Sequence, residues 1–227
     1  MLSYLLKHYD KLLLYLLQHL EIVAASLGLA VIFAVPVGLA LSRSKLASTA
    51  VLGIFSVLYS IPSLALFSFF LPITGLGMKT AVIVVAIYAQ FILLRNTVAG
   101  FQSVDASVLE SGNGMGLSAL QRFYYIELPL ALPVVIAGVR IALVASIGIA
   151  TIAATVNGGG IGTLLFEGLR NMYPVKIFWG IILSSGLSFG ANQALIKLEN
   201  HLLKRAKGEW VGPKSRRREI SLDSSGL

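Results

Sequence analysis

The ionisable side chains of this sequence are too few and too scattered to form a catalytic centre. Its 227 residues include 10 acidic residues, three histidines and no cysteine. Acid–base catalysis needs such groups within hydrogen-bond reach of each other, and thiol catalysis or a zinc–thiolate site needs cysteine. We expect no cluster of His, Asp or Glu in or near an apolar run. The sequence therefore predicts no catalytic residue, no metal site and no cofactor bound by this chain.

Two glycine-rich stretches lack the residues that bind a nucleotide. Residues 75–80 read Gly-Leu-Gly-Met-Lys-Thr, without the Gly-Lys-Ser/Thr ending of a phosphate-binding loop, and no lysine follows the glycines of residues 158–162. Secondary transporters usually carry carboxylates or histidines inside the membrane, whereas the acids of this chain avoid the interiors of its apolar runs. Energy for any transport must therefore come from another protein.

Apolar residues dominate the rest of the chain. They make up 56% of it, and only 12% of the residues are charged, against about 25% in a typical soluble protein. So few polar side chains cannot cover a globular surface. The composition predicts an all-α integral membrane protein and excludes a disordered chain, a fibrous repeat and a disulfide scaffold.

Five apolar runs are long enough to cross a bilayer as helices. A hydrocarbon core of about 30 Å requires about 20 residues of helix. We expect the second run to end where Pro72, Gly75 and Gly77 follow it. The predicted spans cover residues 21–42, 48–71, 79–98, 133–154 and 175–198 of a transmembrane domain over residues 21–200.

The two ends of the chain are expected to lie outside that domain. Residues 1–20 mix charged side chains with leucines and tyrosines, which is typical of an amphipathic helix at the membrane surface. A sixth span is the alternative. Residues 201–227 form a basic, partly disordered tail, which we expect to contact anionic membrane lipids rather than nucleic acid.

Basic residues indicate the orientation of the spans. Arg43 and Lys45 lie in the link between the first two spans, and Lys204–Arg218 is rich in Lys and Arg. Cytoplasmic segments carry an excess of these residues. We therefore expect the N-terminus outside, the C-terminus in the cytoplasm, a cytoplasmic loop over residues 101–129 and an outer link over residues 155–174.

The cytoplasmic loop has the pattern of two helices joined by a turn. Ser118 and Gln121 have the spacing of a capping box, which predicts a helix beginning at about Ala119. Glycines precede that helix, and Pro129 and Pro133 are expected to stop it and start the fourth span. Its exposed apolar residues favour a surface covered by a partner protein over a solvated loop. These residues are Leu109, Met115, Leu120 and Phe123.

This loop resembles the EAA loop of ABC-importer permeases. The family pattern is Glu-Ala-Ala, three residues, Gly, nine residues, Ile, one residue and Leu-Pro. Every spacing is met, although Ser111 and Gly112 replace the two alanines. The positions that match the pattern are Glu110, Gly116, Ile126, Leu128 and Pro129.

The resemblance extends over nearly the whole chain. Five spans with this loop before the fourth look like the small permeases of the methionine-importer type. Four further stretches look like the osmoprotectant branch, which imports glycine betaine, choline, carnitine or similar quaternary amines. They are residues 19–23, 60–66, 128–142 and 156–162. An importer of methionine or another small solute, and a non-transporting membrane scaffold, are the alternatives.

What the resemblance implies is a complex in the bacterial cytoplasmic (inner) membrane. The loop would be a coupling helix seated in a cleft of one of two cytosolic ATPase subunits, which bind ATP and Mg. A second permease, identical or paralogous, and an extracytoplasmic substrate-binding protein complete it. The coupling residues would be Glu110, Ser111, Gly112, Gly116, Leu120, Phe123, Ile126, Leu128 and Pro129.

Three further features are candidates for the translocation path or for contacts between helices. Arg140 lies inside the fourth span, either on the path or a subunit interface, or extended toward the membrane surface. Asn157, Gly159 and Gly160 lie in the outer link, where the resemblance implies a gate. The pair Gly186 and Gly190 allows close helix packing, within the chain or between two chains.

Overall fold

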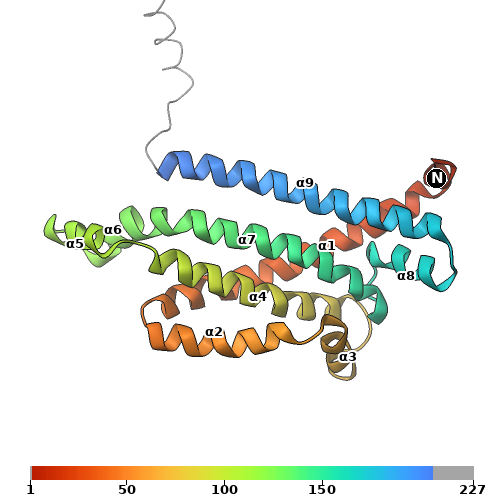
Figure 1. Ribbon diagram of the computed structural model, residues 1–227, viewed down its shortest axis with the longest axis horizontal. Helices are drawn as coiled ribbons and strands as arrows, with labels where there is room; N and C mark the ends of the chain where they lie inside the picture. Colours follow the sequence, from red (N-terminus) through yellow and green to blue (C-terminus); the bar gives the residue numbers. More distant parts are fainter. Residues whose placement is uncertain (1, 207–227) are drawn as a thin grey trace, which may run out of the picture.

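The structure is a computed structural model, which describes residues 2–206. The predicted tail falls mostly on residues 207–227, outside the described residues. The described chain folds into a bundle of long helices (Figure 1), formed by α1 (Leu2–Ser42), α4 (Met78–Gln102), α7 (Leu128–Ala150) and α9 (Pro174–Ala206). Four helices are long and apolar enough to cross a membrane, or five if one bent pair counts as a span. An all-α membrane fold is therefore confirmed.

Helix α4 lies at the centre of the bundle and α9 at its edge. In the most apolar window of α4, 61% of the residues are buried, against 6% for α9. Val84, Val85 and Leu93 of α4 are fully buried and pack in the core with α1 and α7. The position of α9 leaves most of its surface without a partner in the described chain.

The predicted span over residues 48–71 is wrong as one continuous helix. The structure has α2 (Lys45–Ser60) and α3 (Ser63–Thr74), which meet at an angle of 93°. Pro62 causes the break, because a proline disfavours helical geometry in the residue before it, and Ile61 is extended (φ −65°, ψ 131°). The Tyr88 hydroxyl donates to the Ile61 carbonyl at this break.

The expected break near residue 20 is absent. Helix α1 runs on through this region, and its one residue with non-helical dihedrals is His8 (φ −131°, ψ 21°). No glycine or proline interrupts residues 9–27, so nothing in the sequence ends the helix there. Leu12 and His19 are buried in the bundle. An interfacial position for the first turns stays a prediction.

The prediction that Pro129 and Pro133 stop the short cytoplasmic helix is also wrong. The chain stays helical from α6 (Ala119–Arg122) through a π-helical turn (Phe123–Glu127) into α7. Pro129 lies directly after the π-helical turn, where an irregular hydrogen-bond pattern accommodates its missing N–H. Pro133 lies within α7, which continues into a 3₁₀ helix (Thr151–Val156).

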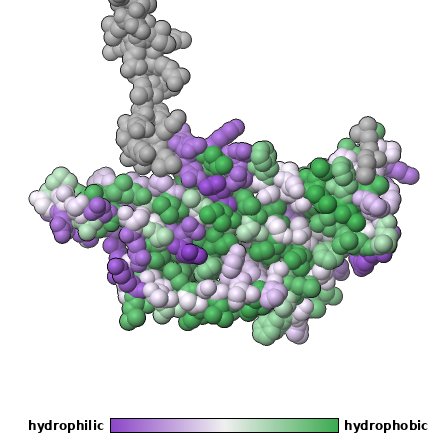
Figure 2. Space-filling view, viewed as in Figure 1, coloured by the Kyte–Doolittle hydropathy of each residue, from purple (hydrophilic) through white to green (hydrophobic). Residues whose placement is uncertain are grey.

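The two ends of the bundle carry different segments. Helix α5 (Ala106–Gly114), α6 and the α1–α2 turn lie at one end, together with the last described turns of α9 (Figure 1). Helix α8 (Gly162–Arg170), α3 and the N-terminal end of α1 lie at the other end. Figure 2 shows hydrophilic residues gathered over the end that holds α5, with mostly hydrophobic residues between the ends.

Candidate functional site

Local hydrogen bonds define both helices of the loop over residues 101–129. The capping box is confirmed: the Gln121 amide donates to Ser118 Oγ at 3.3 Å, and the Ser118 amide donates to Gln121 Oε1 at 2.9 Å. Asp105 caps α5 through a single bond, in which its Oδ1 accepts from the Ser107 amide at 2.8 Å. This bond lowers the pKa of the Asp105 carboxyl, since it stabilises the charged form.

A left-handed residue joins these two helices. Gly116 has φ +77°, a conformation that costs other residues about 1–2 kcal/mol. Its amide donates to the Asn113 carbonyl at 3.0 Å, and the Leu117 amide donates to the Gly112 carbonyl at 3.1 Å. These bonds satisfy carbonyls at the end of α5 and reverse the chain toward α6.

Gly112 stands where the family pattern has alanine. It is buried, and a Cβ at this position would lie 2.7 Å from the Ile126 Cδ1 atom. A Cβ at this position would therefore require the flexible end of the Ile126 side chain to shift. Gly112 and Ile126, two positions of the motif, are brought into contact by the turn.

Glu127 links the loop to the turn between α1 and α2 through ion pairs, a role that was not predicted from the sequence. Its side chain is only 5% exposed and forms ion pairs with Arg43 (Nη2–Oε2, 2.7 Å) and Arg122 (Nε–Oε1, 3.1 Å). Arg122 also donates to Asn113 Oδ1 at 2.7 Å. An acid directly before Leu-Pro, with a basic link at the same membrane face, was the available signal. The loop is therefore tied to both α5 and the α1–α2 turn.

The outward surface of the loop combines one acid with apolar side chains. Glu110 and Ser111 are exposed, and Glu110 forms no ion pair within residues 2–206. Leu120 is 67% exposed and Met115 71%. Phe123 is half-buried instead and stacks on Phe101. The exposed residues Tyr124 and Tyr125 extend this surface beyond the predicted set.

The outer glycines pack against α1 at the opposite end of the bundle. Gly159 and Gly160 have φ near +80°, and the Gly160 amide donates to Gln18 Oε1 at 3.1 Å. A Cβ on Gly160 would lie 3.0 Å from His19 Nδ1. Asn157 is left-handed (φ 61°) and ends the 3₁₀ helix. Gln18 and His19 were missed because nothing local in the sequence links them to residues 157–160.

Arg140 does not lie with these outer residues. It points to α9, where its Nε lies 3.2 Å from Glu199 Oε2 and its Nη1 donates to Asn192 Oδ1 at 3.4 Å. Both alternatives for Arg140, a place on the path or interface and an extension toward the membrane surface, stay predictions. Glu199 was missed as a partner because the fifth span was expected to end at residue 198, whereas α9 continues to Ala206.

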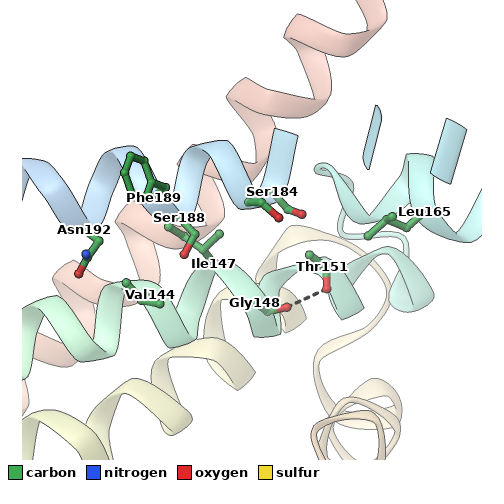
Figure 3. Close-up of a pocket in the computed structure, with 10 residues that line it drawn as sticks. Val144, Ile147, Gly148, Thr151, Leu165, Ser184, Ser188, Phe189 and Asn192 are labelled. Carbon is green, nitrogen blue, oxygen red and sulfur yellow. Dashed lines mark hydrogen bonds between the residues drawn. The ribbon is translucent and has the colours of Figure 1, made fainter. Parts of the chain in front are cut away.

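An open cavity of about 690 Å³, lined by both apolar and polar side chains, lies between α7 and α9, next to α8. Ser188 and Asn192 point from α9 toward α7, while Gly148 and Thr151 lie across the cavity (Figure 3). The sequence alone did not reveal this cavity, although Ser184 and Ser188 recur at helical spacing on α9. The lining residues are Val144, Ile147, Gly148, Thr151, Leu165, Ser184, Ser185, Ser188, Phe189 and Asn192.

Comparison with known proteins places the chain in a family. Residues 26–191 match the family model described as "Binding-protein-dependent transport system inner membrane component". The chain is 38% identical over 165 residues to the glycine betaine/carnitine/choline transport system permease protein OpuCB of Bacillus subtilis (strain 168), covering 73% of this chain and 76% of that protein. It is 39% identical over 189 residues to the carnitine transport permease protein OpuCB of Listeria monocytogenes, covering 83% and 87%.

A solved structure has the same fold. The chain superposes with a TM-score of 0.75 on a chain of the MetNI methionine ABC transporter in an inward-facing conformation. The two are 20% identical, and the match covers 84% of this chain and 95% of that one. The predicted resemblance is confirmed, and the chain belongs to the family of inner membrane components of binding-protein-dependent transport systems.

Proposed function

We propose that this chain forms the translocation path of an ATP-driven importer of quaternary-amine osmoprotectants such as glycine betaine, carnitine or choline. The observation that carries the proposal is the α5–α6 loop, a rigidly held surface with an exposed acid and exposed apolar residues. The cargo class follows from the names of relatives that are 38% and 39% identical.

The loop is built to transmit movement. A partner ATPase that binds ATP and Mg seats on Glu110, Met115 and Leu120, with a basic residue of that partner opposite Glu110. Ile126 and Glu127 then pass the displacement to the bundle, because they lie in the helical segment that continues into α7. Closing of two ATPase subunits moves two such loops together and changes which side of the membrane the path opens to.

A second permease and a substrate-binding protein are the remaining partners, and each has an exposed surface of the bundle to contact. A second permease, identical or paralogous, packs against α9, where an added Cβ on Gly186 or Gly190 would meet no atom within 4 Å. This open space favours packing between chains over packing within the chain. The extracytoplasmic binding protein docks over the outer loop of Asn157, Gly159 and Gly160. The complex lies in the bacterial inner membrane with the N-terminus outside and the C-terminus in the cytoplasm, surrounded by membrane lipids.

Uptake into proteoliposomes tests the transport function. The complete complex is reconstituted with its binding protein and ATP and offered labelled glycine betaine, choline, carnitine and methionine separately. We expect ATP-dependent uptake of at least one quaternary amine. Uptake of methionine alone contradicts the cargo, and no ATP-dependent uptake of any solute contradicts the importer.

Gly116→Asp tests the coupling role of the loop. We expect normal membrane insertion but no ATP-driven uptake, because aspartate strains the turn at φ +77° and adds a charge to the docking surface. Co-purification of the ATPase reports docking directly. Normal uptake by this variant removes the coupling role, and Gly114→Ala, with open space around it, is the matched control.

A further inference from the structure

A groove of about 400 Å³ lies over the middle of α4, between α2 and α7. Helix α4 lies between those two helices in Figure 1, and both pack against it. Phe91 is the fourteenth of the 25 residues of α4, so the groove lies at mid-length of this central helix. Its size falls within the range of about 300–1,000 Å³ of small-molecule sites. The lining residues include Tyr59, Phe91, Arg95, Asn96, Ile141 and Ala145.

Three aromatic rings meet on the α2 side of this groove. The centroid of the Tyr59 ring lies 4.9 Å from that of Phe91, with the planes tilted by 37°, and 5.7 Å from that of Tyr88. Tyr88 is buried, and its hydroxyl bond to the Ile61 carbonyl fixes the cluster to the bend after α2. Tyr59 is 38% exposed and Phe91 is half-buried, so part of their ring surface is open to a solute. Aromatic faces attract cations and are a common means of recognising quaternary ammonium groups.

The carboxyl end of α2 adds partial negative charge at the same place. Helix α2 ends at Ser60, one residue after Tyr59, because Pro62 breaks the span and α3 turns away at 93°. The carbonyls at a helix C-terminus carry about −0.5 elementary charge. Transporters with broken membrane helices use such ends to hold cations near the middle of the membrane. The rings and the helix end therefore both favour a cation in this groove.

Polar side chains line the groove one turn further along α4. Arg95 is exposed and forms no ion pair within residues 2–206. A charged side chain at membrane depth is costly against lipid and usually faces a water-filled cavity, which favours a solvated path on this face. Asn96, whose Nδ2 donates to the Ile92 carbonyl at 2.7 Å, is half-buried beside Arg95. The guanidinium suits a carboxylate, and the carboxamide oxygen suits a hydroxyl.

We propose that this groove is a transient binding site for the quaternary ammonium group of the cargo, which lies against Tyr59 and Phe91 while Arg95 and Asn96 face the other end of the molecule. Resting on the proposed function, this adds where and how the cargo is recognised within the chain. One ammonium site serves glycine betaine, carnitine and choline alike, and the name of one relative contains all three. The positive charge of Arg95 keeps binding of a cation weak, as release from a path requires.

Uptake by variants that lack one ring tests the site. The complete complex is reconstituted with saturating binding protein, and Tyr59→Leu and Phe91→Leu are compared with the wild type. We expect each to reduce uptake of both glycine betaine and choline by about fivefold or more, because a cation loses one aromatic face. Tyr59→Phe keeps the ring and should transport like the wild type. Undiminished uptake by both leucine variants, each still co-purifying with the ATPase, would overturn the proposal.

Cysteine protection tests binding without removing either ring. The chain has no cysteine, so Ile141→Cys introduces a single thiol into this chain at an exposed position in the groove. We expect a small maleimide to label it in the complex, and glycine betaine or choline chloride to slow labelling severalfold. Dimethylbutanol, the uncharged carbon isostere of choline, should not slow it. Ala194→Cys, exposed on α9, is the control and should show no protection.

The two arms separate this site from the proposed function. If the wild type transports no quaternary amine, the proposed cargo fails, yet protection of Ile141→Cys by choline but not by dimethylbutanol still supports an ammonium site. If wild-type uptake is normal, absence of protection at Ile141→Cys overturns the site and leaves the proposed function intact. Equal protection by dimethylbutanol, or at Ala194→Cys, also overturns it, because neither result reports a cation held by aromatic rings.

Discussion

The loops at the two ends of this bundle are held by different kinds of contact. At the α5 end, the loop is held by side chains, through the ion pairs of Glu127 and the contact of Ile126 with Gly112, and it leaves Met115 and Leu120 exposed. At the α8 end, the loop is held by its backbone, because glycines at positive φ let it lie against Gln18 and His19. Exposed apolar side chains at the α5 end are thus held by ion pairs and packing beneath them, whereas the close packing of the loop at the α8 end depends on the absence of side chains.

Removing Glu127, which pairs with two arginines, should reduce the stability of the protein more than any other substitution proposed below. Glu127→Ala leaves Arg43 and Arg122 without their shared acid, and we expect a loss between the ~1 kcal/mol of an exposed pair and the ~3–5 kcal/mol of a buried one. Thermal unfolding of the detergent-solubilised complex measures it. Glu110→Ala is the matched control, because this acid is exposed: it should keep the unfolding temperature but weaken ATPase co-purification. Equal unfolding temperatures for both variants would contradict the linking role.

Filling the space beside Ile126 should have the next largest effect. Gly112→Ala places a methyl group 2.7 Å from the Ile126 Cδ1 atom. Because this atom is the far end of a flexible side chain, we expect a cost at the lower end of the about 1–3 kcal/mol of overpacking. Thermal unfolding and ATP-driven uptake both report it. The double variant Gly112→Ala/Ile126→Val removes the clashing atom and should recover most of the loss. Failure of the second substitution to rescue the first would show that the contact is not the cause.

A comparable change at the opposite end should act through backbone strain. Gly160→Ala forces a side chain into φ +81°, 3.0 Å from His19 Nδ1, and we expect a cost of about 1–2 kcal/mol. No substitution of His19 should rescue it fully, because the strain belongs to the backbone. The measurement is thermal unfolding, with Gly28→Ala, which has open space in α1, as the control. A neutral Gly160→Ala would remove the distinction between the two ends.

The smallest effect concerns pH at the start of α5. The folded-state pKa of Asp105 is lowered by its bond from the Ser107 amide, so the charged cap stabilises α5 above the unfolded carboxyl pKa of about 3.9. That contribution is lost as the pH falls below this value toward the folded pKa. Hydrogen exchange at the Ser107 and Val108 amides should therefore gain protection between acid and neutral pH. Asp105→Asn should abolish the pH dependence while keeping a capped helix.

Local patterns in the sequence predicted the parts of the structure that depend on neighbouring residues. The capping box at Ser118, the turn before it and the membrane helices follow from composition and spacing within one turn or one span. The EAA spacing located the loop residues because that motif is contiguous. The prediction of one continuous helix for the second span was wrong at Pro62. A proline can bend a helix, end it or lie within it, and the outcome depends on the residues that pack around it.

What the sequence by itself determined is a set of apolar helices, the position of the loop with the EAA spacing and the family to which the chain belongs. Only the tertiary structure decided which distant residues meet: Glu127 with Arg43, Gly160 with Gln18, and Arg140 with Glu199. The physical reason is that each of these contacts joins residues that are far apart in the chain and belong to different elements. Periodicity shows which face of a helix is polar, whereas the packing of helices in three dimensions selects its partner.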